Sequence, residues 1–171
     1  MFTRRRTDLA SERMECVWVE INDLKSPSLL VGYIYRNPAS LTTWFDQFVQ
    51  MIDKAYDYKS NFLLLGDFNI DLWEPQSTWD NSTSLVGFHQ LVQSATKITS
   101  TTATLIDHIC TDNRAMVSDV LVSTVSISDH SPVFCTWSFK PSKYLSKSHK
   151  SIKYRSFRNF DNEHSTFWQC L

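Results

Sequence analysis

The sequence predicts a single domain of mixed α/β or α+β class. Strand-like segments alternate with a helix-like segment in the first half of the chain and follow one another in the second half. A length of 171 residues fits one domain. A composition that is 42% hydrophobic, with only 3 glycines, is that of a globular protein and argues against disordered or fibrous character.

The first half of the chain predicts three strands and one helix. Residues 16–21 and 29–35 are rich in β-branched and aromatic residues and are separated by a turn. After a predicted N-cap at Ser40, apolar side chains recur at helical spacing over residues 44–56. Residues 62–65 form a continuous apolar run, which is typical of a strand buried on both faces.

The second half predicts one short helix followed by three strands. The helix is expected over residues 84–94, where apolar residues are spaced three and four apart. The segments 105–111, 117–125 and 132–139 are strand-like. Residues 71–84 contain tryptophan and proline without periodicity and are expected to be irregular.

Charge divides the chain into three parts. Residues 1–14 contain four arginines and two acidic residues, a net charge of +2. Residues 15–139 contain 6 basic and 14 acidic residues, and residues 140–171 contain 7 basic and 2 acidic residues. We therefore expect a basic N-terminal segment, an acidic domain and a basic linker or tail. The tail is consistent with a solvated linker or with phosphate contacts to nucleic acid.

The composition also bears on the cellular location. No segment approaches the roughly 18 uncharged apolar residues of a membrane-spanning helix. The basic start leads into Thr7 and Asp8 instead of an apolar run, so no secretory signal is expected. The four cysteines lie far apart and predict reduced thiols of an intracellular protein, nuclear or cytoplasmic. The sequence predicts no particular protein partner.

A carboxylate and an amide follow the apolar run at 62–65. Gly66 would allow the backbone or a ligand to approach closely. In an extended chain Asp67 and Asn69 share one face while Phe68 points away. Such a pair could hold and orient a water molecule, although an ordinary exit from a strand into a turn uses the same residue types.

A second acidic residue lies inside the apolar segment 105–111 and needs a partner there. His130 could pair with this residue, Asp107, which would orient the imidazole or favour its protonated form. Such an imidazole suits a phosphoryl oxygen, and Asp129 adds an oxygen ligand for a cation such as Mg²⁺. An ordinary polar loop would also explain Asp129 and His130. His108 points away from Asp107 and is expected to be a core residue.

The sequence contains no metalloprotease, P-loop, Rossmann or nucleophile-elbow motif. What remains is an oxygen-rich set of side chains with one histidine. This is the donor chemistry of Mg²⁺-assisted phosphodiester hydrolysis.

Four segments, in this order, resemble the endonuclease/exonuclease/phosphatase superfamily, and more closely the apurinic-like endonuclease domain of LINE-type (non-LTR) retrotransposons. They are residues 33–38 (Tyr-Ile-Tyr-Arg-Asn-Pro), 64–69 (Leu-Leu-Gly-Asp-Phe-Asn), 104–109 (Thr-Leu-Ile-Asp-His-Ile) and 127–132 (Ile-Ser-Asp-His-Ser-Pro). The resemblance implies that residues 15–139 form the C-terminal half of that domain. The implied fold is part of a four-layered α/β sandwich, two packed β-sheets flanked by helices, with its N-terminal part missing.

The resemblance implies a DNA-nicking endonuclease of a retroelement that depends on Mg²⁺ or Mn²⁺. By this resemblance Asp67 activates or positions the attacking water, and Asn69 orients the water or the phosphate. Tyr35 contacts the phosphate near the leaving oxygen. His130, held by Asp107, contacts a non-bridging oxygen.

The resemblance further implies substrate contacts by Ser128, Thr96 and Arg36, and it places Asp129 beside the metal. The Asn and Glu metal ligands of the family's first half have no counterpart in this sequence. Impaired activity is therefore expected. An alternative expectation is a catalytically inactive retroelement fragment that at most binds nucleic acid. A third hypothesis is a phosphatase of the same superfamily.

Overall fold

The computed structural model describes residues 1–11, 13–22, 26–58, 61–75, 78–80, 87–125 and 128–139. The expected basic tail at 140–171 and the start of the expected helix at 84–94 lie outside these ranges. The strands are β1 (Phe2–Arg5), β2 (Glu15–Asn22), β3 (Leu29–Tyr35), β4 (Asn61–Asp67), β5 (His89–Gln90), β6 (Lys97–Ile98), β7 (Ala103–Thr104), β8 (Asp107–Thr111), β9 (Val117–Val122) and β10 (Val133–Trp137). The helical elements are α1 (Thr43–Tyr56) and two 3₁₀ turns, η1 (Thr7–Leu9) and η2 (Arg114–Met116). Residues 78–80, in the segment expected to be irregular, are helical as well.

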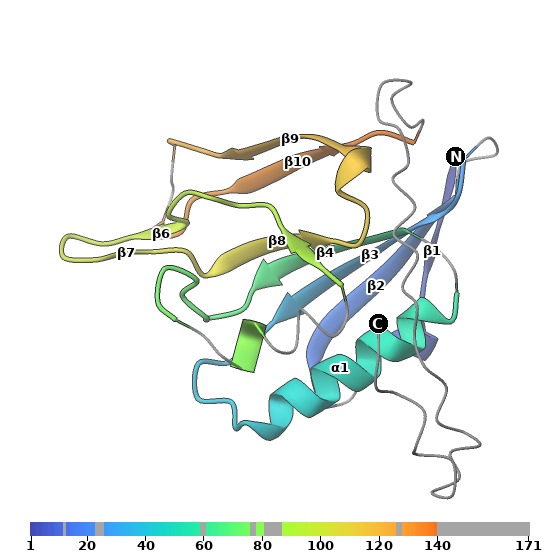
Figure 1. The fold of residues 1–171 in the computed structure, drawn as a ribbon, viewed down its shortest axis with the longest axis horizontal. Helices are drawn as coiled ribbons and strands as arrows, with labels where there is room; N and C mark the ends of the chain where they lie inside the picture. Colours follow the sequence, from blue (N-terminus) through green and yellow to red (C-terminus); the bar gives the residue numbers. More distant parts are fainter. Residues whose placement is uncertain are drawn as a thin grey trace, which may run out of the picture.

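The strands form one large sheet and two small ones (Figure 1). The large sheet has the order β1-β2-β3-β4-β8-β5, in which β3 and β4 are parallel and the other neighbours are antiparallel. Strands β9 and β10 pair with each other, and β6 and β7 form a hairpin that extends beyond the end of the large sheet. The predicted mixed α/β class is confirmed.

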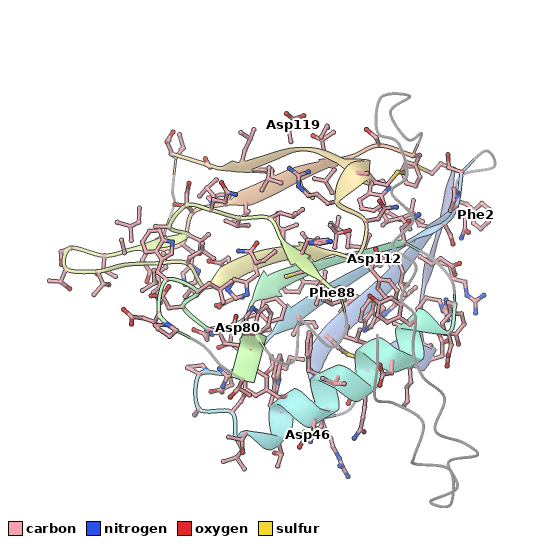
Figure 2. All side chains as sticks on the ribbon, viewed as in Figure 1. Phe2, Asp46, Asp80, Phe88, Asp112 and Asp119 are labelled. Carbon is pink, nitrogen blue, oxygen red and sulfur yellow. The ribbon has the colours of Figure 1, made fainter. Side chains whose placement is uncertain are left out.

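Each face of the large sheet carries its own hydrophobic core. Helix α1 packs on one face, where Trp44 and Phe48 stack with ring centroids 5.3 Å apart. The β9–β10 sheet packs on the other face, over residues such as Leu63 and Ile109. Figure 2 shows Asp46 on the outer side of α1 and Asp119 on the outer side of β9. The described ranges thus contain a helix layer and two sheet layers, and the expected four-layer sandwich stays a prediction.

The register of the central strands brings three polar residues to one row. Tyr35 at the end of β3 pairs with Asp67 at the end of β4, and Asp67 pairs with Asp107 at the start of β8. Paired residues of neighbouring strands lie on the same face. Two positions away, Leu65 and Ile109 pack toward the β9–β10 sheet, so the row faces that sheet as well.

Gly66 sits where β3 and β4 approach each other most closely. Its φ is +150°, and a Cβ there would lie 1.8 Å from the carbonyl oxygen of Ile34. The close approach expected at Gly66 is therefore made by backbone. Any side chain at this position would displace the strand end that carries Asp67.

Two expected helical features are wrong. Helix α1 begins at Thr43 with Thr42 as N-cap and no side-chain capping bond, so Ser40 is not the cap. Residues 87–94 are not helical, because the Leu91 N–H donates to Ile109 and the preceding two residues join the sheet as β5. Apolar spacing alone did not separate a short edge strand, followed by the buried Leu91 and Val92, from a short helix.

The N-terminal segment contains a strand that the sequence analysis does not predict. Strand β1 pairs with β2, and the Arg6 side chain after it is only 3% exposed. Its guanidinium donates to Asp8 at 2.7 and 2.9 Å and lies 3.7 Å from the ring centre of Tyr58. One arginine of the expected basic N-terminal segment is therefore buried against the rest of the domain.

Among the described residues, Cys16, Cys110 and Cys135 carry free thiols. Cys170 lies outside the described ranges. None of the described helices has the length and apolar character required to span a bilayer.

Candidate active site

Three side chains from separate segments meet at the row formed by β3, β4 and β8. Asp67, Asp107 and His130 are half-buried, and one potential ligand atom of each lies within 4.8 Å of the others. Across the described ranges this is the one group of three or more His, Cys, Asp or Glu side chains that is close enough to share a metal ion. The two carboxylates come from neighbouring strand ends, and the imidazole comes from the loop before β10.

Asp107 and His130 form a direct pair. The Nδ1 atom of His130 lies 3.0 Å and 3.3 Å from the two carboxylate oxygens of Asp107. Since an ionised carboxylate only accepts, the proton of this bond is on Nδ1. The other ring nitrogen, Nε2, is the atom that does not face the Asp107 carboxylate. The contact expected between these residues is present in the structure, 23 positions apart in the chain.

The chain turns sharply after Asp67. Asn69 has a φ of +48°, a left-handed conformation that asparagine tolerates better than most residues. Its backbone N–H donates to the Asp67 carboxylate at 3.0 Å, and its side-chain amide donates to the carbonyl of Arg36 at 2.8 Å. The expectation that Asp67 and Asn69 share a face of one extended strand is therefore wrong. The turn nevertheless keeps both residues at the strand end.

The environment of Asp67 disfavours its negative charge. Burial raises the pKa of the Asp67 carboxyl, and the nearby Asp107 carboxylate acts in the same direction. The Asn69 N–H, His130 and Lys97 oppose the shift without cancelling it. A carboxylate with a raised pKa is a stronger proton acceptor than an ordinary aspartate.

Thr96 connects the start of the strand that carries Asp107 to the loop that carries His130. Its hydroxyl accepts the backbone N–H groups of Ile106 and Asp107 at 3.1 and 2.9 Å, and its carbonyl accepts the N–H of Ser131 at 2.7 Å. One residue therefore ties the start of β8 to the loop that carries His130. The Thr96 side chain is fully buried, and the substrate contact expected of this residue stays a prediction.

We expect Thr96→Val to destabilise the protein, because it keeps the shape of the side chain and removes the acceptor of two N–H groups. A buried donor without a partner costs about 1–3 kcal/mol, so the free energy of unfolding should fall by about 2 kcal/mol. Thr96→Ser keeps the hydroxyl and should lose much less. Urea denaturation of the two variants measures the difference, and equal stability would contradict the assigned role of the hydroxyl.

The loop before β10 orders the remaining expected site residues. The exposed Ser128 hydroxyl accepts the N–H of His130 at 3.1 Å, which fixes the start of the turn. Asp129 is exposed and lies 3.3 Å from the ammonium group of Lys97, which holds the pKa of Asp129 below its ordinary value. Asp129 thus lies outside the three-residue cluster, and its metal contact stays a prediction. So does a DNA contact of Ser128.

A pocket of about 430 Å³ opens beside the Asp107–His130 pair. It is lined by Tyr33, Pro132 and Val133 together with the pair itself. Tyr33 was not among the expected site residues, although alternation along β3 puts it on the same face as Tyr35. Burial raises the pKa of Tyr33, and the charges of Asp107 and Asp67 act in the same direction.

Lys97 is another residue near the site to which the sequence analysis gave no role. Its backbone forms an isolated bridge with His130, and its ammonium group opposes the rise in the pKa of Asp67 and lowers the pKa of Asp129. The sequence signal was the position of Lys97 directly after Thr96. The pairing of its strand with the His130 loop depends on the fold and has no local signal.

The donor set fits a hard divalent cation. Mg²⁺ is commonly held by one or two carboxylates, with waters and substrate phosphate oxygens completing its shell. Asp67 and Asp107 supply two carboxylates at adjacent strand ends. The imidazole of His130 is bonded to Asp107 through Nδ1, so its part in the cluster is consistent with a contact to substrate beside a cation.

Comparisons with solved structures find the same fold in several phosphate-processing enzymes. The endonuclease domain of TRAS1, a telomere-specific non-LTR retrotransposon, aligns with a TM-score of 0.67 and 14% identity over 81% of this chain and 67% of its own. An AP endonuclease from Archaeoglobus fulgidus aligns with a TM-score of 0.53 and 13% identity over 70% and 64%. A mannosyl-6-phosphatase from Bacteroides thetaiotaomicron aligns with a TM-score of 0.54 and 18% identity over 71% and 57%.

The chain therefore spans between about half and two thirds of these structures. A search of curated proteins finds no significant match. Residues 19–130, about two thirds of the chain, match the sequence model of one family, and this match includes Asp67, Asp107 and His130. The chain belongs to the Endonuclease/Exonuclease/phosphatase family.

Proposed function

We propose that the protein hydrolyses phosphodiester bonds of DNA in the presence of Mg²⁺ or Mn²⁺ and acts as a nicking endonuclease of a retroelement. The observation that carries this proposal is the meeting of Asp67, Asp107 and His130 at one end of the sheet. Two carboxylates that can bind a divalent cation and an oriented imidazole suit metal-assisted attack of water on a phosphate. The likeness to a retrotransposon endonuclease domain supports DNA as the substrate.

In the proposed reaction each residue has a task set by its position. Asp67, whose raised pKa makes it a better proton acceptor, takes a proton from the attacking water. Asn69 orients that water or the phosphate. His130, as an imidazolium, donates its Nε2–H to a non-bridging oxygen while its Nδ1–H donates to Asp107. Tyr35, next to Asp67 in the row, contacts the phosphate near the leaving oxygen. A divalent cation bound at the carboxylates would neutralise charge on the phosphate oxygens.

The test is metal-dependent nicking of a supercoiled plasmid by the full chain. We expect nicking with Mg²⁺ or Mn²⁺ and none with EDTA. His130→Ala should lower the rate about 100-fold or more, the usual cost of removing a group that stabilises developing charge. His89→Ala serves as a matched control, because His89 is an exposed histidine on β5.

The other outcomes separate the alternatives. Salt-sensitive DNA binding without nicking would overturn catalysis and support an inactive protein that binds nucleic acid. Turnover of a small phosphomonoester in preference to DNA would favour a phosphatase, as in the mannosyl-6-phosphatase that shares the fold. Nicking that His130→Ala leaves unchanged would place the activity elsewhere or in a contaminant.

A further inference from the structure

We propose that Arg36 is a positioning residue for the turn that carries Asp67 and Asn69, acting from the helix side of the sheet. This inference rests on the proposed function and gives Arg36 a role other than the substrate contact that the family resemblance implies. It is carried by a closed set of hydrogen bonds between the end of β3 and the turn after β4.

Four hydrogen bonds join Arg36 to this turn or close the turn itself. The Arg36 N–H donates to the Asp67 carbonyl at 2.9 Å, and the Asn69 side-chain amide donates to the Arg36 carbonyl at 2.8 Å. The Arg36 Nη1 group donates back to the Asn69 carbonyl at 3.4 Å. The Asn69 N–H then reaches the Asp67 carboxylate at 3.0 Å. The guanidinium therefore holds Asn69, whose backbone N–H donates to the carboxylate of the candidate base, Asp67.

The guanidinium lies on the α1 face of the sheet. Its central carbon is 5.5 and 5.6 Å from the ring centres of Trp44 and Phe45, within the range of cation–π contacts. Asp107 and His130 lie on the opposite face, which the β9–β10 sheet covers. A phosphate held by these two residues would approach from the side away from the guanidinium.

The remaining donors of Arg36 are also turned inward. Nη2 donates to the Ser40 carbonyl at 3.4 Å, and Nε is buried with no partner within the described part of the chain. Among the described residues, no ion pair joins Arg36 to a carboxylate, and burial lowers the pKa of the guanidinium. The contacts of this charge are thus two loop carbonyls and two aromatic rings. They clamp the turn after β4 to the loop before α1.

Positioning matters here because Asn69 holds an unfavourable backbone conformation. A φ of +48° is maintained only where the surroundings fix it, and the Asn69 carbonyl is one of the groups that Arg36 holds. Without the hydrogen bond from the guanidinium to the Asn69 carbonyl, the turn can adopt a more favourable backbone conformation. The N–H of Asn69 then no longer donates to the Asp67 carboxylate. The carboxylate would then lose the bond that orients it.

The decisive variants are Arg36→Met, which keeps the packing stem and removes the charge, and Arg36→Lys, which keeps the charge and removes the fork. A positioning role predicts that both lower kcat about tenfold, with KM and the salt dependence of DNA binding unchanged. A phosphate contact predicts a higher KM for Arg36→Met, a salt slope reduced by about 0.9 and substantial rescue by lysine. That second pattern would overturn the proposal. Lys54→Gln, an exposed cation on α1, is the matched control.

A readout that does not depend on catalysis separates this proposal from the proposed function. In ¹⁵N NMR spectra of the full chain, the Asn69 amide should shift and exchange faster with solvent in both Arg36 variants and stay unchanged in Lys54→Gln. An unaltered Asn69 amide would overturn the positioning role even if the wild type nicks DNA. A wild type that does not nick would overturn the proposed function, while the NMR result still decides the role of Arg36. If Arg36→Met does not fold, Arg36→Lys carries both readouts.

Discussion

Asp67→Asn should remove nicking activity and at the same time raise the melting temperature. The amide keeps an oxygen that can accept the Asn69 N–H, so the turn after β4 should survive. It cannot accept the proton of an attacking water, and loss of a general base typically lowers the rate about 10²–10⁴-fold. The negative charge beside Asp107 disappears as well. We therefore expect a loss of about 1,000-fold in kcat together with a melting temperature a few degrees higher at pH 7.

The stability difference between Asp67→Asn and wild type should depend on pH, in the direction set by the raised pKa of Asp67. Because the folded state raises the pKa of Asp67, the fold favours the protonated carboxyl. The stabilising contribution of that proton is complete below the unfolded pKa of about 3.9 and is lost as the pH rises through the folded value. The advantage of Asp67→Asn over wild type should thus be largest at pH 7 and vanish toward pH 4. Differential scanning calorimetry at both pH values measures it, and a constant advantage would show that charge is not its cause.

Such an opposition between activity and stability is expected where a site holds like charges close together. Asp67 and Asp107 are paired residues on adjacent strands. The repulsion between their two carboxylates lowers the stability of the fold, and its expected benefit is functional, in binding a cation or acting on a phosphate. A matched control is Asp119→Asn on the outer side of β9, where the carboxylate is exposed. Neither activity nor melting temperature should change in that variant.

The strands that carry the site were predictable because their apolar residues set both position and face. Strand β3 has the predicted bounds, and β4 and β8 contain or lie within the predicted segments. The pairing of Asp107 with His130 also follows from a simple rule, since a carboxylate inside an apolar segment requires a partner. Physical requirements that are local to one strand are visible in the sequence.

What the sequence could not supply depends on contacts between distant segments. The buried position of Thr96 arises because three segments converge on it, and no local pattern signals that. The side of the sheet on which Arg36 lies depends on where α1 packs. In the same way β1 forms because β2 offers it an edge, although its residues carry the charges of a solvated segment. The resemblance placed Thr96 and Arg36 near the site, and the substrate contacts that it implies for them stay predictions.

His108, directly next to Asp107, should make the protein sensitive to acid. It was expected to be a core residue, and it is 1% exposed, stacked on Phe68 with ring centroids 5.0 Å apart. Its Nε2 donates to the carbonyls of Ile70 and Leu105 at 2.9 and 3.2 Å. Burial lowers the pKa of His108 to about 4, and Nδ1, which would take the second proton, has no partner among the residues described.

Because the pKa of His108 is lowered in the folded state, this side chain binds a proton in the unfolded chain at pH values where it stays neutral in the folded chain. The unfolded value is about 6.5, so stability from the neutral imidazole is complete above that pH and is lost as the pH falls toward 4. At about 1.4 kcal/mol for each pH unit of difference, the full loss is about 3 kcal/mol, most of it reached by pH 4.5. Urea denaturation at pH 7 and pH 4.5 measures this loss.

His108→Gln should abolish most of that loss, because the glutamine amide can donate to the same two carbonyls and does not titrate. At pH 7 the variant should be somewhat less stable than wild type, since it loses the stacking on Phe68. His89→Gln, at an exposed position of β5, should keep the wild-type pH dependence. If His108→Gln shows the same decline as wild type, the acid sensitivity has another source. If the decline disappears, protonation of the buried His108 side chain is what destabilises the protein at low pH.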